Sequence, residues 1–464
     1  MPKSSSGEFR RPKGFRLSYH QGSGAHKIIK MLYQLFEWFA KNGIKFPGSG
    51  LVHFITFRVL VTVLLSLIIT MVYGKVLIRF LKKKQIGESV RELGLAGEKM
   101  KSGTPTMGGI IILLAILIPT LLLANLDKVY VRLMILCTVW LGIIGFVDDY
   151  LKIRAKRISR EKGIAYKKTN ADGLAGKFKI FGQVILGIII GTTLYFNPSV
   201  VVKREIMGTK PGTAFVPQRG EHKVGEDTIY SEGQLHRFVT VKTPITTIPF
   251  LKNHEFNYAK LLPASMENYT YILYILVVIF IVTAVSNGAN ITDGLDGLAT
   301  GVSAIIGLGL GVFVFVSGDV RIAEYLNIMY IPNLSELSIF IAAFVGACVG
   351  FLWYNAYPAQ VFMGDTGSLA LGGIIASLAI IVRKELLIPI FCFVFLIELL
   401  SVMIQVSYFK YTKRKYGEGR RVFLMSPLHH HYQKLGYHES KIAVRFWVVT
   451  ILSMILAVVT LKLR

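Results

Sequence analysis

The chain has 464 residues, of which 53% are hydrophobic and 17% are charged, and its mean hydropathy is +0.53. A soluble chain of this length would divide into several cores, but here the apolar residues form blocks of roughly 20, enough to cross a bilayer. The net charge of +26 flanks these blocks, so we expect contact with anionic membrane lipid and no nucleic-acid partner. The composition excludes a soluble globular protein and predicts an all-α, polytopic integral membrane protein.

The chain begins with two segments that we expect to lie outside the spanning part. Residues 1–30 are polar and basic and contain Gly and Ser, which predicts a disordered N-terminal extension. Residues 31–50 mix aromatic residues with lysines and are short for a span, which predicts an interfacial helix on the bilayer. Residues 51–464 are expected to form one transmembrane domain of about ten helices. The candidate spans are 55–80, 107–125, 130–147, 178–196, 269–286, 298–316, 336–354, 368–382, 386–408 and 441–462.

Lysines and arginines gather in the loops that follow the first, third and ninth spans, whereas the short loops on the other side carry few. The positive-inside rule places the basic loops in the cytoplasm and both chain termini outside. Residues 197–268 then form a long extracytoplasmic loop. Its own lysines and arginines do not argue against this side, because long segments cross the membrane largely regardless of their charge. Within it, the alternating stretch RFVTVKTPITTIPF predicts a small β-hairpin or an extended cap.

Five aspartates lie where apolar spans end, and all fall on the expected cytoplasmic side. They are Asp148 and Asp149 in GIIGFVDDYLK, Asp293 and Asp296 in NGANITDGLDGLATG, and Asp365 in VFMGDTGSLALGG. A carboxylate at the edge of hydrocarbon is costly, so it is usually paired, metal-bound or functional. Neighbouring glycines allow backbone N–H groups to approach an anionic ligand closely. The set predicts a shared site for a cation and a phosphorylated ligand.

The first acidic motif offers two different directions for its side chains. Adjacent helical residues point about 100° apart, so Asp148 and Asp149 can face different partners. Lys152 follows Asp148 by one helical turn and can pair with it. A solvated helix end is the ordinary alternative for an isolated Asp-Asp pair.

In the second motif, Asn290, Asp293 and Asp296 recur every three residues, as on one face of a helical turn. An Asx-rich turn that caps the next span is the alternative there. Asp365 precedes a hydroxyl-rich turn, and its hard oxygen ligands suit Mg²⁺ near a phosphate, although one of these groups can simply cap a helix. Phe362 suits ordinary packing or the stacking of a base.

Two further polar motifs remain open. His429, His430 and His431 in SPLHHHYQKLG can bind phosphate or transfer protons, or can lie on a solvated loop. Lys101 and Thr106 in KSGTPTMGG precede a span, where a Pro/Gly turn entering a helix is the alternative.

Taken in order, five motifs over roughly 55–464 resemble the polyprenyl-phosphate N-acetylhexosamine-1-phosphate transferase superfamily. They are KSGTPTMGG, GFVDDYLK, NGANITDGLDGLATG, NAYPAQVFMGDTGS and RRVFLMSPLHHHYQ. The MSPLHHHYQ form is similar to the muramoyl-pentapeptide branch rather than to relatives that use UDP-GlcNAc. The resemblance implies a ten-helix glycosyl-1-phosphate transferase of the bacterial inner membrane, with a cytoplasmic active-site cleft and often homodimeric. It also implies Mg²⁺, with UDP-MurNAc-pentapeptide and undecaprenyl phosphate as substrates, and lipid I and UMP as products of a step in peptidoglycan synthesis.

The same resemblance implies roles for individual residues. Asp365 resembles the metal ligand, and Asp148 and Asp149 match the catalytic pair, with Asp148 as the candidate base or nucleophile. The residues that match the uridine pocket are Gly294, Leu295, Asp296, Asn355 and Phe362. Other polar residues match the lining of the cleft, and of these His430 is assigned to the catalytic set and the rest to substrate binding: Lys101, Thr106, Lys152, Asn290, Asp293, His429, His430 and His431.

Two questions stay open on the sequence. A one-step attack of the lipid phosphate and a two-step route through an aspartyl phosphate on Asp148 or Asp149 both fit the residues. A cation-coupled transporter also carries acids in its spans, but these are expected near mid-membrane rather than at one face. The N-terminal extension and the 197–268 loop depart from the compact pattern of the resembled family.

Overall fold

The computed structural model describes residues 42, 49–84, 103–161, 174, 176–205, 216–231, 234–249, 255–326 and 328–460. The predicted N-terminal extension, nearly all of the predicted interfacial helix and Lys101 lie outside these described residues. They therefore stay predictions.

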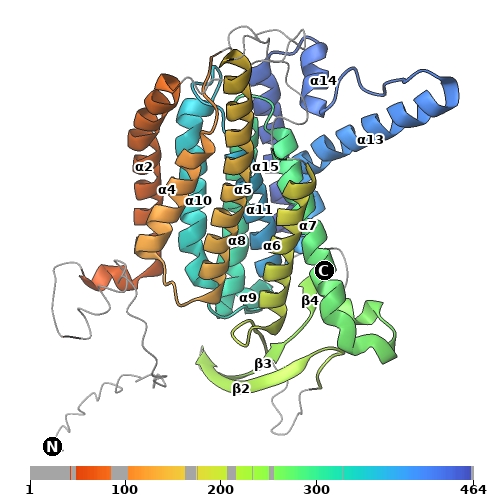
Figure 1. Cartoon of the computed structure of the whole chain (residues 1–464). Coiled ribbons are helices and arrows are strands. Elements are labelled where there is room, and N and C mark those ends of the chain that lie inside the picture. Colours follow the sequence, from red (N-terminus) through yellow and green to blue (C-terminus); the bar gives the residue numbers. More distant parts are fainter. Residues whose placement is uncertain are drawn as a thin grey trace, which may run out of the picture.

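Helices that run along a common direction make up most of the described chain (Figure 1). Within the described ranges, nine helices are long and apolar enough to cross a membrane. They include α2 (Ile55–Lys83), α5 (Val129–Glu161), α6 (Gly176–Phe196), α7 (Thr270–Thr292), α8 (Leu298–Gly318), α10 (Leu337–Asn355), α11 (Gly364–Ile381), α13 (Phe393–Tyr416) and α15 (Glu439–Val459). A tenth apolar helix, α4 (Gly109–Leu123), has 15 residues. The prediction of an all-α polytopic membrane protein is confirmed, and each of the ten predicted spans overlaps one of these helices.

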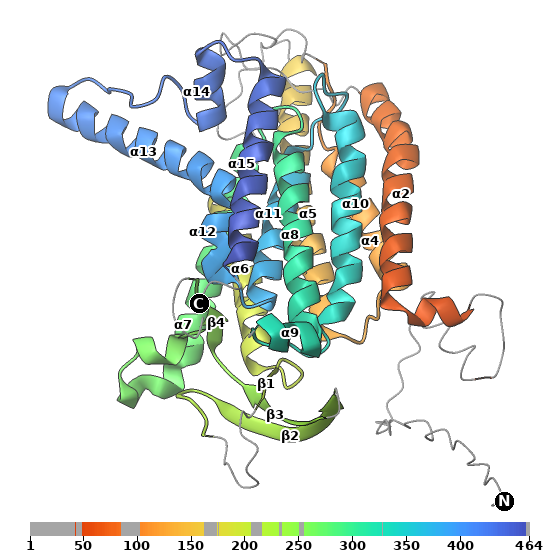
Figure 2. The ribbon, with the colours of Figure 1, turned by 180° about the vertical axis from the view of Figure 1, so that it is seen from behind.

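Helix α11 forms the centre of the bundle, with the other helices arranged around it (Figures 1 and 2). Its spanning window is 89% buried, whereas that of α2 is 28% buried, so α2 turns most of its surface outward, toward the lipid expected around it. Small residues allow the close approach: a Cβ on Gly109 of α4 would overlap the backbone of Gly367 in α11. Such small-residue contacts replace the hydrophobic driving force that is absent between helices in lipid.

Short helices connect the long ones. They are η1 (Ser49–His53), η2 (Tyr258–Leu261), η3 (Ala264–Tyr269), α9 (Val320–Leu326), η4 (Leu334–Glu336), η5 (Glu385–Leu387), α12 (Ile388–Phe391) and α14 (Leu428–Lys434). Helix α14 lies at the end of the bundle where α5 ends, and α13 leaves the bundle at an angle on that side (Figure 1).

The opposite end of the bundle carries the strands (Figure 1). A three-stranded antiparallel sheet has the order β1-β3-β2, and a separate pair joins β4 to β5. The bounds are β1 (Val202–Glu205), β2 (His222–Ser231), β3 (Gln234–Lys242), β4 (Ile245–Thr247) and β5 (Glu255–Asn257). Strands β3 and β4 occupy the stretch whose alternation predicts extended structure. We call the described part of residues 197–268 the cap.

Candidate active site

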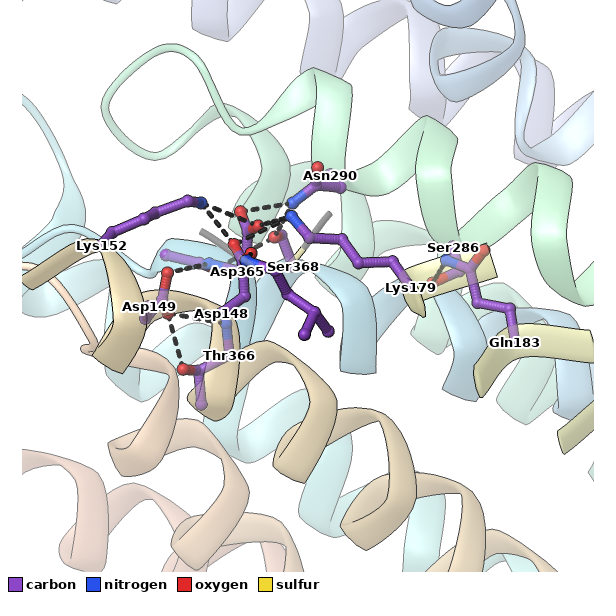
Figure 3. A network of polar contacts seen from close by, with 12 residues as sticks. Asp148, Asp149, Lys152, Lys179, Gln183, Ser286, Asn290, Asp365, Thr366 and Ser368 are labelled. Atoms are coloured by element: carbon purple, nitrogen blue, oxygen red, sulfur yellow. Dashed lines mark hydrogen bonds and ion pairs between the residues drawn. The ribbon is translucent and has the colours of Figure 1, made fainter. Parts of the chain in front are cut away.

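Three carboxylates meet at the end of the bundle opposite the cap. Asp148 and Asp149 lie on α5 and Asp365 lies in the first turn of α11, and each offers an oxygen within 4.8 Å of the others. The two helices touch backbone to backbone here, because a Cβ on Gly145 would overlap the carbonyl of Asp365. Chain segments more than 200 residues apart thus contribute to one cluster, as the sequence predicts for these acids (Figure 3).

Two ammonium groups join the carboxylates of Asp148 and Asp365. Lys152 Nζ lies 2.5 Å from Asp148 Oδ2 and 3.0 Å from Asp365 Oδ2. Lys179 Nζ, from α6, lies 2.8 Å and 2.5 Å from the same two oxygens. The predicted pairing of Lys152 with Asp148 is therefore present, and each lysine also bridges to a second helix.

Asp149 points away from the two lysines and caps α11. One of its oxygens accepts hydrogen bonds from the backbone N–H and the hydroxyl of Thr366, at 2.9 and 2.6 Å, and the other accepts from the N–H of Asp365 at 3.1 Å. A carboxylate at a helix N-terminus satisfies otherwise unpaired N–H groups and interacts favourably with the helix dipole. The two adjacent aspartates thus have different roles, with Asp148 facing cations and Asp149 holding α11 in place.

Gly364 lies between Asp149 and the wall formed by Thr106. Its φ is +72°, and a Cβ there would come within 2.6 Å of Asp149 Oδ2 and 3.1 Å of Thr106 Oγ1. The segment that contains Thr106 is held by backbone hydrogen bonds, since the N–H of Phe362 donates to Pro105 O and the N–H of Gly108 donates to Phe362 O, both at 2.8 Å. Thr106 is therefore placed at the acidic cluster, and its role in substrate binding stays a prediction.

Asn290, near the end of α7, completes the surroundings of Asp365. Its Nδ2 donates to Asp365 Oδ1 at 2.9 Å and to Ser368 Oγ at 2.8 Å. Asp365 thus accepts from an amide on one oxygen and from two ammonium groups on the other. Asp293 ends the same helix and is half-buried, with its N–H directed to the carbonyl of Asn290 at 3.3 Å.

A second group of predicted residues lies where the turn after α7 meets α14. The backbone N–H and the Nδ1 of His429 lie 3.1 and 3.0 Å from the two carboxylate oxygens of Glu398 on α13, and both side chains are fully buried. The opposite ring nitrogen faces Gly294, because a Cβ on Gly294 would overlap His429 Nε2. The glycine therefore leaves the space that this imidazole fills.

Asp296 and Asn355 hold two loops together. Asp296 Oδ2 accepts from the N–H of Ala359 at 2.9 Å. Asn355 Oδ1 accepts from the N–H of Gly297 at 3.2 Å, and its Nδ2 donates to Val361 O at 3.0 Å. Between these loops Leu295 is buried and Phe362 is half-buried. Five residues predicted for a uridine pocket therefore share one region, and two of them also support its backbone.

The other histidines of α14 point elsewhere. His430 Nδ1 lies 2.7 Å from Gln433 Oε1, although its ring is 4.2 Å from that of His429. His431 Nδ1 accepts from the N–H of Leu424 at 3.2 Å, and its ring packs on Phe423. The structure thus turns only His429 toward Gly294.

The acidic cluster has the donors that a divalent cation needs. The cluster holds three carboxylates and two ammonium groups, and these five ionised side chains sum to one negative charge. Hard carboxylate oxygens suit Mg²⁺, which takes one or two carboxylates and keeps several waters. Asp365, the predicted ligand, and Asp148 would coordinate the ion by releasing a lysine, whereas Asp149 would have to release the start of α11.

Sequence reasoning missed two charged residues of the site. Lys179 lies just inside a predicted span, where a lysine is costly, and that cost is the signal that would have identified it. Glu398 likewise lies in the interior of α13 as a carboxylate among apolar residues. Neither residue belongs to one of the five motifs.

Comparisons with known proteins agree with the motifs. The model described as "Glycosyl transferase family 4" matches residues 227–383, and "Phospho-N-acetylmuramoyl-pentapeptide-transferase signature 1" matches residues 101–113. The phospho-N-acetylmuramoyl-pentapeptide-transferase of Flavobacterium psychrophilum is 55% identical over 437 residues, covering 94% of this chain and 100% of the relative. Those of Flavobacterium johnsoniae and Parabacteroides distasonis are 54% and 51% identical with the same coverage. The chain belongs to the phospho-N-acetylmuramoyl-pentapeptide-transferase family.

Proposed function

We propose that the chain moves phospho-MurNAc-pentapeptide from UDP-MurNAc-pentapeptide to undecaprenyl phosphate. An oxygen of the lipid phosphate bonds to the β-phosphorus of the UDP-sugar, and the bond from that phosphorus to the bridging oxygen breaks. The products are undecaprenyl-pyrophosphoryl-MurNAc-pentapeptide, which is the lipid I of peptidoglycan synthesis, and UMP. The observation that carries the proposal is the cluster of Asp148, Lys152, Lys179 and Asp365 at the ends of apolar helices.

The cluster suits phosphoryl transfer because this chemistry depends mainly on positioning and on stabilising negative charge. Lys152 and Lys179 can exchange a carboxylate partner for a phosphate oxygen of either substrate. Asp148 and Asp365 keep both ammonium groups in place before the substrates bind, so little reorganisation is needed when charge develops. Asn290 orients Asp365 through its 2.9 Å hydrogen bond.

Mg²⁺ is part of the proposal, with Asp365 and Asp148 as its protein ligands. When bound, the ion would polarise phosphoryl oxygens and offset their charge. The predicted metal role of Asp365 agrees with its position, because it is the acid whose side chain contacts both lysines and Asn290.

A single displacement is favoured over an aspartyl-phosphate intermediate. Asp148 is fully buried, with Oδ1 accepting from the N–H of Leu174 at 2.7 Å and Oδ2 engaged by Lys152 and Lys179. The oxygens of Asp149 are occupied by α11. A lipid phosphate is itself an anionic nucleophile and needs no proton removed, so neither aspartate has to attack.

The nucleotide is assigned to the region between the turn after α7 and α14. Gly294, Leu295 and Phe362 would contact the uracil, and Asp296 and Asn355 would position the backbone around it. His429 would present Nε2 toward the same space, with Glu398 fixing its ring. Asp293, His430 and His431 remain proposed contacts at the rim.

The proposed location is the bacterial inner membrane, with the acidic cluster facing the cytoplasm. Basic residues support this orientation, since Lys82 and Lys83 end α2 and Lys413, Arg414 and Lys415 end α13. Both helices end on the side of the acidic cluster (Figure 1). A homodimer is proposed from the family resemblance alone, and light scattering of the detergent-purified chain tests it.

The test is release of UMP by the purified chain supplied with undecaprenyl phosphate, UDP-MurNAc-pentapeptide and varied Mg²⁺. We expect Mg²⁺-dependent release that Asp365→Asn lowers by about a thousandfold, because one ligand and the partner of two lysines lose their charge. Asp127→Asn removes an exposed carboxylate at the other end of α5 and serves as the control. Wild-type rates in Asp365→Asn, or faster release of UMP from UDP-GlcNAc, would overturn the assignment.

A further inference from the structure

A small cavity lies at the cap end of the bundle, far from the acidic cluster. It is enclosed by the ends of α6 and α7, by the cap, and by the turn that follows α11, and its empty volume is about 320 Å³ including the mouth. Helix α11 has 18 residues, with Asp365 in its first turn and Arg383 just after its end, which separates the two sites by about 27 Å at 1.5 Å per residue. The cavity is therefore distinct from the proposed active site.

The lining of the cavity is largely apolar but includes basic side chains. Lys242, His222 and Arg383 contribute to it, and none of its lining residues is acidic. The Arg383 side chain lies 5.7 Å over the ring of Tyr274, and it donates one long hydrogen bond, at 3.4 Å, to Ile245 O. Among the described residues, no carboxylate oxygen lies within 4.0 Å of this guanidinium. Arg383 is 6% exposed, so its charge is buried without an ion pair.

Two acids of this region form direct contacts elsewhere, although the charge of Glu385 also acts on Arg383 from beyond ion-pair distance. Glu385 Oε1 accepts from the hydroxyl of Tyr258 at 3.1 Å. Glu221 pairs with Arg204 at 3.0 Å. Neither carboxylate lines the cavity.

The backbone at Arg383 adopts a conformation that suits glycine better than arginine. Arg383 follows the end of α11 with a φ of +57°, in the left-handed region that glycine adopts most readily. Its N–H donates to Ile380 O at 3.1 Å, and that of Lys384 donates to Ala379 O at 2.9 Å, which closes the helix end. A glycine would serve this turn better, so the side chain needs another explanation.

Two residues that line the cavity carry buried hydroxyls. Tyr274 is 1% exposed and Thr243 is 6% exposed, and both line the cavity. Within the described residues, neither hydroxyl has a hydrogen-bond partner. A buried polar group without a partner is costly, so both point to a ligand that accepts hydrogen bonds.

We propose that this cavity binds an oxyanion of the phosphate class, held by Arg383 and Lys242 and by the hydroxyls of Thr243 and Tyr274. A guanidinium offers two parallel N–H groups to a phosphate, and an ammonium group adds a second charge. Lys242 is free to contribute, since its Nζ makes one long contact of 3.4 Å with Asn197 O. The ligand compensates both the buried guanidinium and the unpaired hydroxyls.

A lipid headgroup is the favoured source of the phosphate. Tyr195, Phe196 and Tyr271 pack together beside the cavity with ring centroids 5.1 to 6.2 Å apart. Aromatic residues gather at the level of lipid headgroups, so the cavity is expected at the depth where phosphodiesters lie. A soluble phosphate offers the same chemistry and is the other source.

The experiment compares both sources on the full chain. Native mass spectrometry measures retention of phosphatidylglycerol against diacylglycerol, which lacks the phosphate, and calorimetry measures binding of inorganic phosphate. Arg383→Gly should lower the affinity by about tenfold or more, the usual size of a lost charged hydrogen bond. It should not lower thermal stability in the absence of ligand, because glycine suits the turn. Its UMP release should stay at the wild-type rate.

Two further variants sharpen the result. Tyr274→Phe removes only the unpaired hydroxyl and should also weaken binding, whereas Lys260→Gln removes an exposed charge from the same cap and should not. Selective loss of phosphatidylglycerol supports a headgroup ligand, and selective loss of inorganic phosphate supports a soluble one. Equal binding of both probes by the wild type, Arg383→Gly and Tyr274→Phe, or no binding by any of them, overturns the proposal.

Discussion

Buried charged side chains lie at both ends of α11, but their surroundings differ. At its start, Asp148 and Asp365 share two lysines at 2.5 to 3.0 Å, and Asp149 accepts hydrogen bonds from the first turn of the helix, so each charge has a partner. At its other end, Arg383 is buried over the ring of Tyr274 and donates to one carbonyl, and the buried carboxylate of Glu385 acts on it without an ion pair within 4.0 Å among the described residues. The first arrangement is preorganised and can exchange a partner for substrate. The second has no direct ion pair in the described part of the chain, which is why we propose a ligand there.

The largest effect is expected for Asp148→Asn at the acidic end. The neutral amide leaves Lys152 and Lys179 with one shared carboxylate, so the kcat for UMP release should fall by about a thousandfold. Measurable residual turnover, together with inversion of configuration at a chiral β-phosphorus, would agree with a single displacement. Retention of configuration would instead establish a covalent intermediate.

Lys179→Met should lower kcat by about a hundredfold, because it removes one of two cations near the developing charge. The control is Lys177→Met, since Lys177 lies on the same helix two residues away and is exposed. The measurement is the kcat for steady-state UMP release by both variants, compared with the wild type. If the two variants behave alike, Lys179 has only a structural role.

Gly364→Ala tests the join between α11 and Asp149. The new methyl group would lie within 2.6 Å of Asp149 Oδ2 on a backbone with φ of +72°, so we expect about a tenfold loss of kcat and a lower Tm. Gly417→Ala is the matched control, because Gly417 has a φ of +77° and no atom within 4 Å of its Cβ. An equal effect in both variants would mean that backbone strain alone is responsible.

The smallest effect concerns pH at the cap end. Burial lowers the pKa of Lys384 from 10.5 to about 8, so the folded cap favours the neutral amine. The opened cap binds more protons between these values, and the free energy of opening should therefore rise as the pH increases from 8 toward 10. Hydrogen exchange of Thr247, whose N–H donates to Arg383 O, measures this opening. Lys384→Met should remove that contribution to the slope, and an unchanged slope would refute it.

The sequence predicts the helices well because each span is a long apolar run, and the acids stand out where those runs end. It predicts one shared site for five aspartates, of which Asp148, Asp149 and Asp365 gather, whereas Asp296 binds the N–H of Ala359 instead. It does not distinguish Asp149, whose role as a cap depends on where α11 begins in space. The pairing of His429 with Glu398 likewise depends on packing between α13 and α14.

The cap was less accessible to sequence reasoning. The alternation of apolar and polar residues predicts strands in the cap, but the cavity depends on contacts between the cap and the turn after α11. Arg383, read alone, is one basic residue in a short loop. Its significance comes from burial, from a positive φ and from two unpaired hydroxyls, none of which a local pattern encodes.

The shortness of α4 has a consequence for the surrounding bilayer. Its 15 residues extend about 22 Å, whereas the hydrocarbon of a typical membrane is about 30 Å thick. Leu114 and Ile118 are exposed on this helix, so lipid is expected to cover that face and to thin locally to match it. Helix α4 begins three residues after Thr106, so the thinned part of the bilayer would lie beside the acidic cluster. The membrane surface would be closer to the bilayer centre there. The distance along the membrane normal from a polyprenyl-bound phosphate to Asp365 and the two lysines would then be shorter.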